Sequence, residues 1–215
     1  MKKIFYKVLN RDQRKIFPQL KFLDAEGFYL AGGTGLALQL GHRTSLDFDF
    51  YNRDHFSPDE IFAKLEKNFP GKVVEISKAE DTLLVRISKT SASFFYYEYP
   101  LVYPLRETEG PLLASLEDIG AMKLAALVGR AKKRDYIDIY YLIKVLGLSK
   151  MLAVAEKKYP SLNLYFVRRA LSFFADVEEE EGRIEVFDKN FSWEKAKKEI
   201  FAEVRKYQLG MIKGG

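Results

Sequence analysis

Two aspartates that are separated by one residue are the strongest candidates for chemistry in this chain. The segment Leu46-Asp47-Phe48-Asp49-Phe50 alternates apolar and polar residues strictly, which predicts a strand with two unlike faces. Asp47 and Asp49 would then project to one side, while Leu46, Phe48 and Phe50 enter the core. Two carboxylates held together repel each other unless a cation lies between them. Hard oxygen ligands of this kind suit Mg²⁺, particularly where phosphates complete its coordination shell.

A glycine-rich turn, Gly32-Gly33-Thr34, precedes this strand and is followed by a helix-like segment at residues 35–40. Glycine lets the backbone approach a ligand closely, and the amides at a helix N-terminus favour an anion. The turn therefore predicts a phosphate cradle, and the aspartates predict a metal site. Together they indicate a site for a nucleoside triphosphate. The alternative is a tight turn followed by an edge strand with two solvated aspartates.

The loop between these two motifs, Gly41-His42-Arg43-Thr44-Ser45, is polar. Arg43 and Ser45 flank the predicted metal strand, and Ser45 shares the face of Asp47. We therefore assign both residues to the nucleotide site, with Ser45 contacting phosphate or metal-bound water. His42 is a weaker candidate, because a loop histidine can simply cap the turn.

A second polar cluster follows in the later half of the chain. Ser115 and Asp118 form a capping-box-like helix start, and Lys123 lies within the helix that we expect to run to about Ala131. On its residues alone, Lys123 has the ordinary reading of a solvated side chain with a snorkelling stem. A basic run, residues 130–134, comes next. Asp135 and Asp138 follow at a spacing that makes them neighbours on one helical face, where they would pair with nearby bases.

Periodicity predicts the elements that hold these residues. Helices are expected at 11–26, with Pro18 as a kink, and at 58–69 after the N-cap Ser57. Residues 72–105 predict an antiparallel meander that extends the sheet begun at Phe28 and Asp47. Further helices are expected at 149–159, 163–175 and 192–208. The fold class is therefore α+β: a mixed or antiparallel sheet flanked by helices, followed by a helical bundle. We predict two domains, residues 1–110 and 111–215.

Composition limits the function classes. The 215 residues are 47% hydrophobic, which is enough for a good core, and contain no cysteine, which excludes disulfides, thiolate metal sites and a cysteine nucleophile. We read no signal peptide and no membrane span, so a soluble cytoplasmic protein is expected. The net charge of +5 is compatible with nucleic acid. Lys195, Lys197, Lys198 and Arg205 give the last helix a basic side, which suits RNA phosphates or a solvated face. Residues 177–182 predict a solvated acidic loop.

Two blocks of the sequence carry a family resemblance. The string LAGGTGLALQLGHRTSLDFDF resembles the core motif of DNA polymerase β-like nucleotidyltransferases, and it is closer to the AbiEii/AbiGii toxin family, the MenT-like nucleotidyltransferases of toxin–antitoxin systems. The downstream block SLEDIGAMKLAALVGRAKKRDYIDIYYL resembles the same family. Two blocks in the right order span roughly the first two-thirds of the chain.

The resemblance implies roles for three further positions. Lys123, in the KLAAL segment, would contact the triphosphate. The segment from Arg134 to Ile139 matches the family's RDxxDL-like motif, in which an acid serves as a base or positions the lysine. We favour Asp138 for that role and keep Asp135 as the reserve. Many polymerase β-like enzymes carry a third metal carboxylate on a neighbouring strand. Glu98 is the candidate here, and an exposed edge-strand glutamate is the alternative.

The resemblance also implies an activity. The chain would transfer a nucleoside monophosphate from an NTP to an acceptor hydroxyl, with Mg²⁺ as cofactor and a tRNA 3′ end as the expected acceptor. The helical domain would complete the active-site cleft, and a cognate antitoxin would be the protein partner. Two alternatives stay open: a nucleotide-binding module that has lost transferase activity, and an enzyme that modifies a protein hydroxyl.

Overall fold

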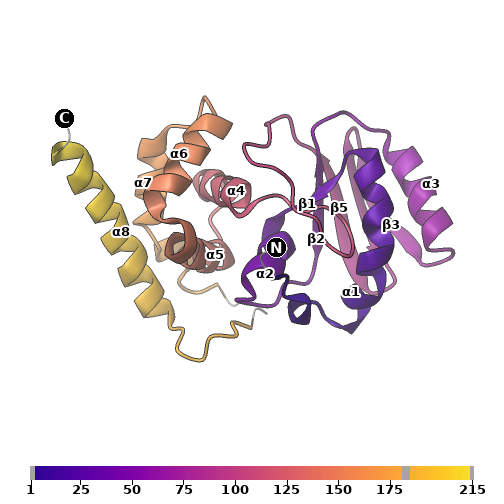
Figure 1. Cartoon of the computed structure of the whole chain (residues 1–215), viewed down its shortest axis with the longest axis horizontal. Coiled ribbons are helices and arrows are strands. Elements are labelled where there is room, and N and C mark those ends of the chain that lie inside the picture. The colour runs from indigo at the N-terminus through magenta and orange to yellow at the C-terminus, as the bar shows by residue number, and fades with distance from the viewer. Residues whose placement is uncertain (1–2, 181–184, 214–215) are drawn as a thin grey trace. The chain divides into compact units, whose positions relative to one another are not determined.

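The chain forms two compact units, Met1–Ser115 and Leu116–Gly215, in a computed structural model that describes residues 3–180 and 185–213 (Figure 1). The first unit contains a sheet with flanking helices, and the second contains only helices. The predicted α+β class, with a helical C-terminal part, is therefore confirmed. The division falls slightly later in the chain than the 110/111 boundary taken from the sequence.

A mixed five-stranded sheet organises the first unit, with strand order β1-β2-β5-β4-β3. The strands are β1 (Tyr29–Leu30), β2 (Phe48–Asn52), β3 (Val73–Ala79), β4 (Thr82–Ile87) and β5 (Thr90–Tyr96). The last three form the antiparallel meander expected from their alternating patterns. β5 pairs with β2 in parallel, so the meander joins the sheet beside the strand that carries Asp49.

Short helical elements flank this sheet. They are η1 (Tyr6–Val8), α1 (Arg11–Ile16), η2 (Phe17–Glu26), α2 (Gly32–Leu40) and α3 (Pro58–Asn68). The single helix predicted for residues 11–26 is wrong in part, because α1 ends at Ile16 and the chain continues as a 3₁₀ helix. Pro18 explains the change, since it has no N–H and restricts the residue before it. Ser57 caps α3 by accepting from the Glu60 amide at 3.4 Å.

Aromatic side chains on one face of the sheet form the core of the first unit. Phe48, Phe50 and Phe94 are each 0% exposed, and the rings of Phe50 and Phe94 stack 5.1 Å apart. Fully burying such a side chain contributes about 1.5–3 kcal/mol. Leu46, which the alternation placed in the core, is 50% exposed. That prediction was wrong because β2 begins only at Phe48.

The second unit is built around α4 (Leu116–Gly129). Its other elements are α5 (Lys133–Leu146), α6 (Leu148–Lys158), α7 (Leu164–Leu171), η3 (Ala175–Val177) and α8 (Trp193–Lys213). Figure 1 shows α4 beside α5, α6 and α7, with α8 running along the outside of these helices. Gly120 of α4 faces Met151 of α6: a Cβ at Gly120 would lie 3.5 Å from the terminal methyl carbon of Met151, an ordinary contact distance.

The segment before α8 is held more firmly than a solvated acidic loop. Glu178 accepts a hydrogen bond from Trp193 Nε1 at 2.9 Å and pairs with Lys197, and a carboxylate oxygen of Glu180 accepts from the Lys133 amide. The hydrogen bonds from Lys197 and Trp193 lower the pKa of Glu178. Residues 181 and 182, which belong to the same predicted loop, lie outside the described residues.

Tyr136 links α5 to the end of α7. It is 1% exposed, and its hydroxyl donates to the carbonyl oxygens of Ala170, at 2.9 Å, and Phe173, at 2.7 Å. Burial raises the pKa of Tyr136 to about 12. The phenol is therefore neutral in the folded protein, where it acts as a donor.

We expect Tyr136→Phe to lower the free energy of unfolding by about 1–3 kcal/mol, because two carbonyl groups lose their donor. Since the folded pKa is raised, the phenol's share of stability is complete below its unfolded pKa and is lost as pH rises through the folded value. Tyr136→Phe should therefore weaken the alkaline destabilisation that begins near pH 10, measured by urea unfolding across pH. Tyr165→Phe, at an exposed tyrosine of α7, is the control and should change neither quantity.

Candidate active site

The N-terminus of α2 lies directly against β2 and the loop that precedes it. Gly32 has φ +59°, and a Cβ there would lie 2.5 Å from Oδ2 of Asp49. A Cβ on Gly33 would lie 2.8 Å from a guanidinium nitrogen of Arg43 and 3.0 Å from Oγ of Ser45. The missing side chains are thus what allows these groups to meet. Five of the residues assigned to the nucleotide site from the sequence come together here.

Backbone amides open towards this junction. α2 begins at Gly32, three residues before the predicted helix start, and its N-cap Ala31 provides no side-chain hydrogen bond. The first intrahelical bond runs from the Gly35 amide to the Ala31 carbonyl, at 2.9 Å. The amides of Gly32, Gly33 and Thr34 therefore have no acceptor within the helix. Together with the helix dipole, they favour an anion at this end.

Two contacts fix the helix to the aspartate strand. The Ala31 amide donates to the carbonyl of Asp49 at 3.0 Å, and the hydroxyl of Thr34 donates to the carbonyl of Asp47. The Thr34 side chain, 1% exposed, therefore joins two elements, and only its amide remains for a phosphate. Asp47 is exposed just before β2, while Asp49 is half-buried within it.

A hydrogen bond from α1 holds the loop that carries Arg43 and Ser45. Gln13, fully buried in α1, donates from Nε2 to the Ser45 carbonyl at 2.9 Å and forms a capping box with Asn10. Arg43 is 2% exposed and donates to the Thr44 carbonyl at 2.8 Å. His42 is also buried, at 4% exposure. Sequence reasoning missed Gln13: the Asn10-x-x-Gln13 spacing signals a helix start but not the contact with this loop.

In the second unit, Lys123 joins both acids of the downstream motif. Its Nζ lies 2.6 Å from Oδ1 of Asp135 and 2.8 Å from Oδ2 of Asp138. The side chains of Lys123 and Asp135 are each 11% exposed, and that of Asp138 is 0% exposed. The lysine comes from α4 and the acids from successive turns of α5, so the packing of two helices creates the cluster. Lys123 is therefore not the solvated side chain that its sequence context suggests.

The burial of Asp138 bears on its role. The sequence left two possibilities for an acid in this motif, a base for the attacking hydroxyl or a positioning group for the lysine. A carboxylate with no exposed surface, already bound to an ammonium, is poorly placed to receive a proton from an incoming hydroxyl. The geometry favours the positioning role, shared with Asp135.

The comparison with known families covers residues of both units. Residues 20–111 and 107–209 match the family described as nucleotidyl transferase AbiEii toxin, type IV toxin–antitoxin system. The chain belongs to the AbiEii nucleotidyltransferase toxin family. It is therefore a nucleotidyltransferase, and the family is that of toxins of type IV toxin–antitoxin systems.

Individual relatives support the same assignment. An uncharacterized protein of Aquifex aeolicus is 31% identical over 177 residues, which cover 80% of this chain and 86% of the relative. The crystal structure of JHP933 from Helicobacter pylori has a TM-score of 0.59 at 17% identity, covering 99% and 96% of the two chains. MenT4, a nucleotidyltransferase toxin from Mycobacterium tuberculosis, has a TM-score of 0.50 at 18% identity, covering 90% and 82%. At such identities the solved structures show a shared fold.

This AbiEii-family chain has no acid at the strand position next to Asp49. In the parallel pairing of β2 with β5, Ser93 lies opposite Asp49, and β5 contains no carboxylate. Glu98, the sequence candidate for a third metal ligand, is exposed and lies two residues beyond the end of β5. Its position favours the alternative of a surface glutamate.

A second buried ion pair in the AbiEii-family chain was not expected from its sequence. Lys158 Nζ, at the end of α6, lies 2.9 Å from Oδ1 of Asp118 in α4, and both side chains are 0% exposed. Lys158 follows Lys157 and precedes Tyr159, a context typical of a solvated helix end, so no local pattern reveals the pair. It ties the first turn of α4 to the last turn of α6.

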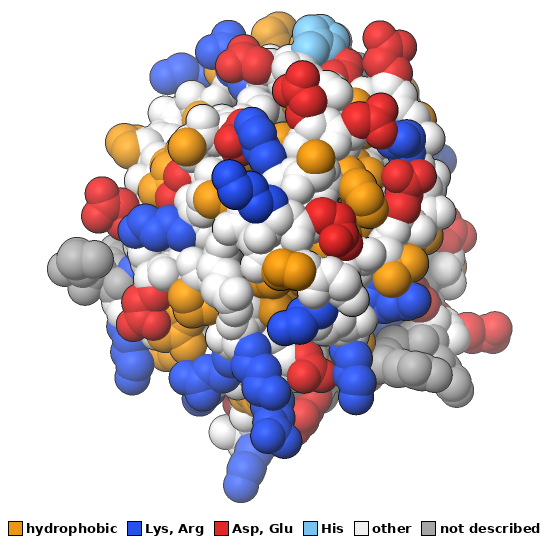
Figure 2. Space-filling view, turned by 90° about the vertical axis from the view of Figure 1, so that its right-hand side faces the viewer, with side chains coloured by type: hydrophobic (Ala, Val, Ile, Leu, Met, Phe, Trp, Pro, Cys, Tyr) orange, Lys and Arg blue, Asp and Glu red, His pale blue; other side chains and the backbone are white. Residues whose placement is uncertain are grey.

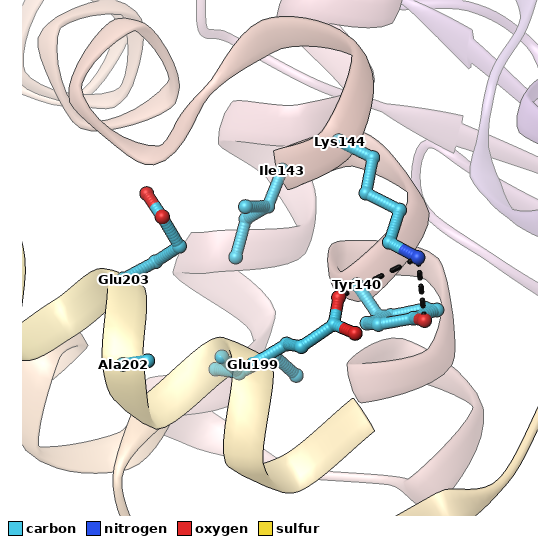
Figure 3. A pocket seen from close by; sticks show the side chains of 7 residues that line it. Tyr140, Ile143, Lys144, Glu199, Ala202 and Glu203 are labelled. Carbon is cyan, nitrogen blue, oxygen red and sulfur yellow. Dashed lines mark hydrogen bonds and ion pairs between the residues drawn. The ribbon is translucent and has the colours of Figure 1, made fainter. Parts of the chain in front are cut away.

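A small hollow lies between α5 and α8, with a volume of about 250 Å³. Figure 3 shows Lys144 reaching across its rim to Tyr140 and Glu199. Lys144 donates to the Tyr140 hydroxyl at 2.5 Å and lies 3.5 Å from Glu199, and the hydrogen bond to Tyr140 raises the pKa of Lys144. These groups satisfy one another across the hollow.

The net positive charge is not gathered into one broad patch on the α3 and β3 side of the first unit. Figure 2 shows acidic and basic side chains interspersed there, with lysine and arginine side chains gathering towards the lower edge. In the part of the chain that the structure describes, no helix is long and apolar enough to cross a membrane.

Gly32→Ala tests the close approach of α2 to β2. The new Cβ would enter contact distance of the Asp49 carboxylate, in addition to the strain of a left-handed backbone. We expect the left-handed strain of about 1–2 kcal/mol plus an overpacking penalty of about 1–3 kcal/mol, measured as the free energy of unfolding of the purified chain.

Gly71→Ala is the matched control, because Gly71 has φ +65° and nothing within 4 Å of its Cβ position. It should show the backbone strain alone. Equal losses at the two positions would contradict the packing that we describe at Asp49.

Lys123→Met tests the buried cluster of the second unit. Removing the ammonium leaves two buried carboxylates without their cation, which should lower stability by about 3–5 kcal/mol. The triple variant Lys123→Met/Asp135→Asn/Asp138→Asn removes all three charges and should recover much of that loss. Lys150→Met, at a partly exposed pair with Glu117, should change stability by about 0–1 kcal/mol. A triple variant as unstable as Lys123→Met would show that charge is not the cause.

Proposed function

We propose that this chain transfers a nucleoside monophosphate from an NTP to a hydroxyl of RNA in a magnesium-dependent reaction, with a tRNA 3′ end as the acceptor. One observation carries the proposal. At Gly32 and Gly33, helix amides, the Arg43 guanidinium, the Ser45 hydroxyl and the Asp49 carboxylate approach the same short piece of backbone. Donors for a phosphate and a ligand for its metal ion thus stand side by side.

The donor set on β2 fits a magnesium ion. Asp47 and Asp49 supply hard carboxylate oxygens, and Mg²⁺ commonly uses one or two protein carboxylates together with waters and substrate phosphates. Among residues 3–180 and 185–213, no three acidic, histidine or cysteine side chains form a complete metal cage, which suits an ion that shares its shell with the substrate. When bound, the ion would stabilise the negative charge that develops on the transferred phosphoryl group.

The residues of the chain then have separate roles in the reaction. The amides of Gly32, Gly33 and Thr34 bind phosphate oxygens, and Arg43 and Ser45 contact the same phosphates from the loop. Lys123, held by Asp135 and Asp138, neutralises charge on the pyrophosphate that leaves. Asp47 or Asp49 takes the proton of the acceptor hydroxyl, because Asp138 is buried and paired with Lys123.

The test incubates purified chain with total tRNA, magnesium and each labelled NTP in turn. Replacing a residue that only supports a metal ligand typically lowers activity by roughly 10–100-fold. Asp49→Asn replaces a proposed ligand itself, so it should reduce label transfer by more than that. Its circular dichroism spectrum should match that of the wild type. Glu98→Gln, at an exposed residue outside β5, should transfer label as the wild type does.

The outcomes separate the alternatives. Label on tRNA from the wild type, lost in Asp49→Asn, supports the proposal and identifies the nucleotide. Label that appears only on protein when a cell extract is added moves the acceptor to a protein hydroxyl. Bound nucleotide without any transfer indicates a module without activity. Undiminished transfer by Asp49→Asn would remove β2 from the mechanism.

A further inference from the structure

A row of aromatic side chains continues from the candidate active site along the same face of the sheet. Its members come from β1, β2 and the segment at and beyond the end of β5, and we call them the aromatic row: Tyr29, Tyr51, Phe95, Tyr97 and Tyr99. Tyr29 is buried at 3% exposure, and the other four are half-buried.

Each ring of the aromatic row contacts at least one other ring of the row. Tyr51 is central: its ring centroid lies 6.1 Å from Tyr29 in a stacked arrangement, 5.8 Å from Phe95 and 5.2 Å from Tyr97. Tyr97 in turn lies 5.3 Å from Tyr99. Four of the rings, those of Tyr51, Phe95, Tyr97 and Tyr99, therefore form a connected and partly accessible surface, in which Tyr97 meets Tyr51 and Tyr99 edge to face.

Strand register places this surface on the face of Asp49. Asp49 and Tyr51 are two residues apart on β2, so they project to the same side at a spacing of about 7 Å. Tyr51 pairs with Tyr29 on β1 and with Phe95 on β5. The Tyr97 amide donates to the Asn52 carbonyl at 2.7 Å, so the pairing continues past the end of β5.

Folding alone does not account for aromatic rings at these positions. The hydrophobic core lies on the opposite face, where Phe48, Phe50 and Phe94 are 0% exposed. On the face of Asp49, by contrast, Tyr51, Phe95, Tyr97 and Tyr99 keep part of their surface accessible. Exposed aromatic faces on a sheet are how many proteins hold unpaired bases, because every base has a π face.

We propose that the aromatic row is a stacking platform for a nucleobase, an inference that rests on the proposed transferase function. In a nucleotide, a single ribose separates the base from the phosphate. Tyr51 lies two residues after Asp49 on β2, so a base could stack on the platform while Asp49 binds the metal ion of the phosphate. The base can come from the NTP or from the unpaired end of the acceptor RNA. Both sources have the same stacking chemistry.

The experiment compares Tyr51→Leu and Phe95→Leu with Tyr96→Leu. Tyr96 is next to Phe95 on β5 but projects to the other face, where its ring stacks on His55 at 4.0 Å, so it is a matched control. KM is measured separately for each labelled NTP and for total tRNA. We expect Tyr51→Leu and Phe95→Leu to raise one KM by roughly 5- to 150-fold, the range for losing the stack of one base. Tyr51→Phe, which keeps the aromatic ring, should have the KM of the wild type.

The readouts distinguish each result. A raised KM for the NTP alone identifies the nucleotide's base, and a raised KM for tRNA alone identifies the acceptor's base. Unchanged KM values in both leucine variants, or equal changes in Tyr96→Leu, would overturn the platform.

A wild type without transferase activity would contradict the proposed function instead. In that case, equilibrium binding of the NTPs and of a short single-stranded RNA to the same variants tests whether the aromatic row binds a base. Weaker binding in Tyr51→Leu than in Tyr51→Phe supports it, and equal binding overturns it. Circular dichroism melting identifies any variant that fails to fold.

Discussion

The close approach of α2 to β2 is the constraint on which the rest of the site depends. Without a side chain at Gly32, the helix N-terminus can lie against the Asp49 carboxylate, and the Ala31 amide and Thr34 hydroxyl hold the two elements in that position. A carboxylate beside a helix N-terminus is also electrostatically favourable. The amides at the start of α2 and the Asp49 carboxylate are therefore positioned by backbone packing, and preorganised polar groups of this kind are what electrostatic catalysis requires.

Much of this half of the site could be predicted, because its signals are local. Glycine pairs mark close approaches, and period-two alternation marks a two-faced strand, so the sequence predicted the close approach at Gly32 and Gly33 and the place of Asp49 on a strand. The errors arose where alternation continued past the end of the element. Leu46 fits the pattern of β2 but lies outside it, and Pro18 divided a helix that periodicity treated as continuous.

The second unit could not be predicted in the same way, because its contacts depend on the angle between helices. Spacing along α5 places Asp135 and Asp138 on one face, but nothing in the sequence aims that face at Lys123. The buried pair of Asp118 with Lys158 joins residues 40 positions apart, and each member resembles an ordinary surface charge. The family resemblance marked Lys123 as functional without revealing that it is buried.

The charged groups of the two units differ in their exposure to water. Asp47 is exposed and Asp49 half-buried, so water reaches their carboxylate oxygens. Lys123 is nearly desolvated, and a buried ion pair adds little stability because desolvation offsets the attraction. The effect of Asp135 and Asp138 is then to fix the ammonium in one place. A free lysine loses rotamer entropy when it binds a partner, whereas Lys123 has already lost that freedom during folding.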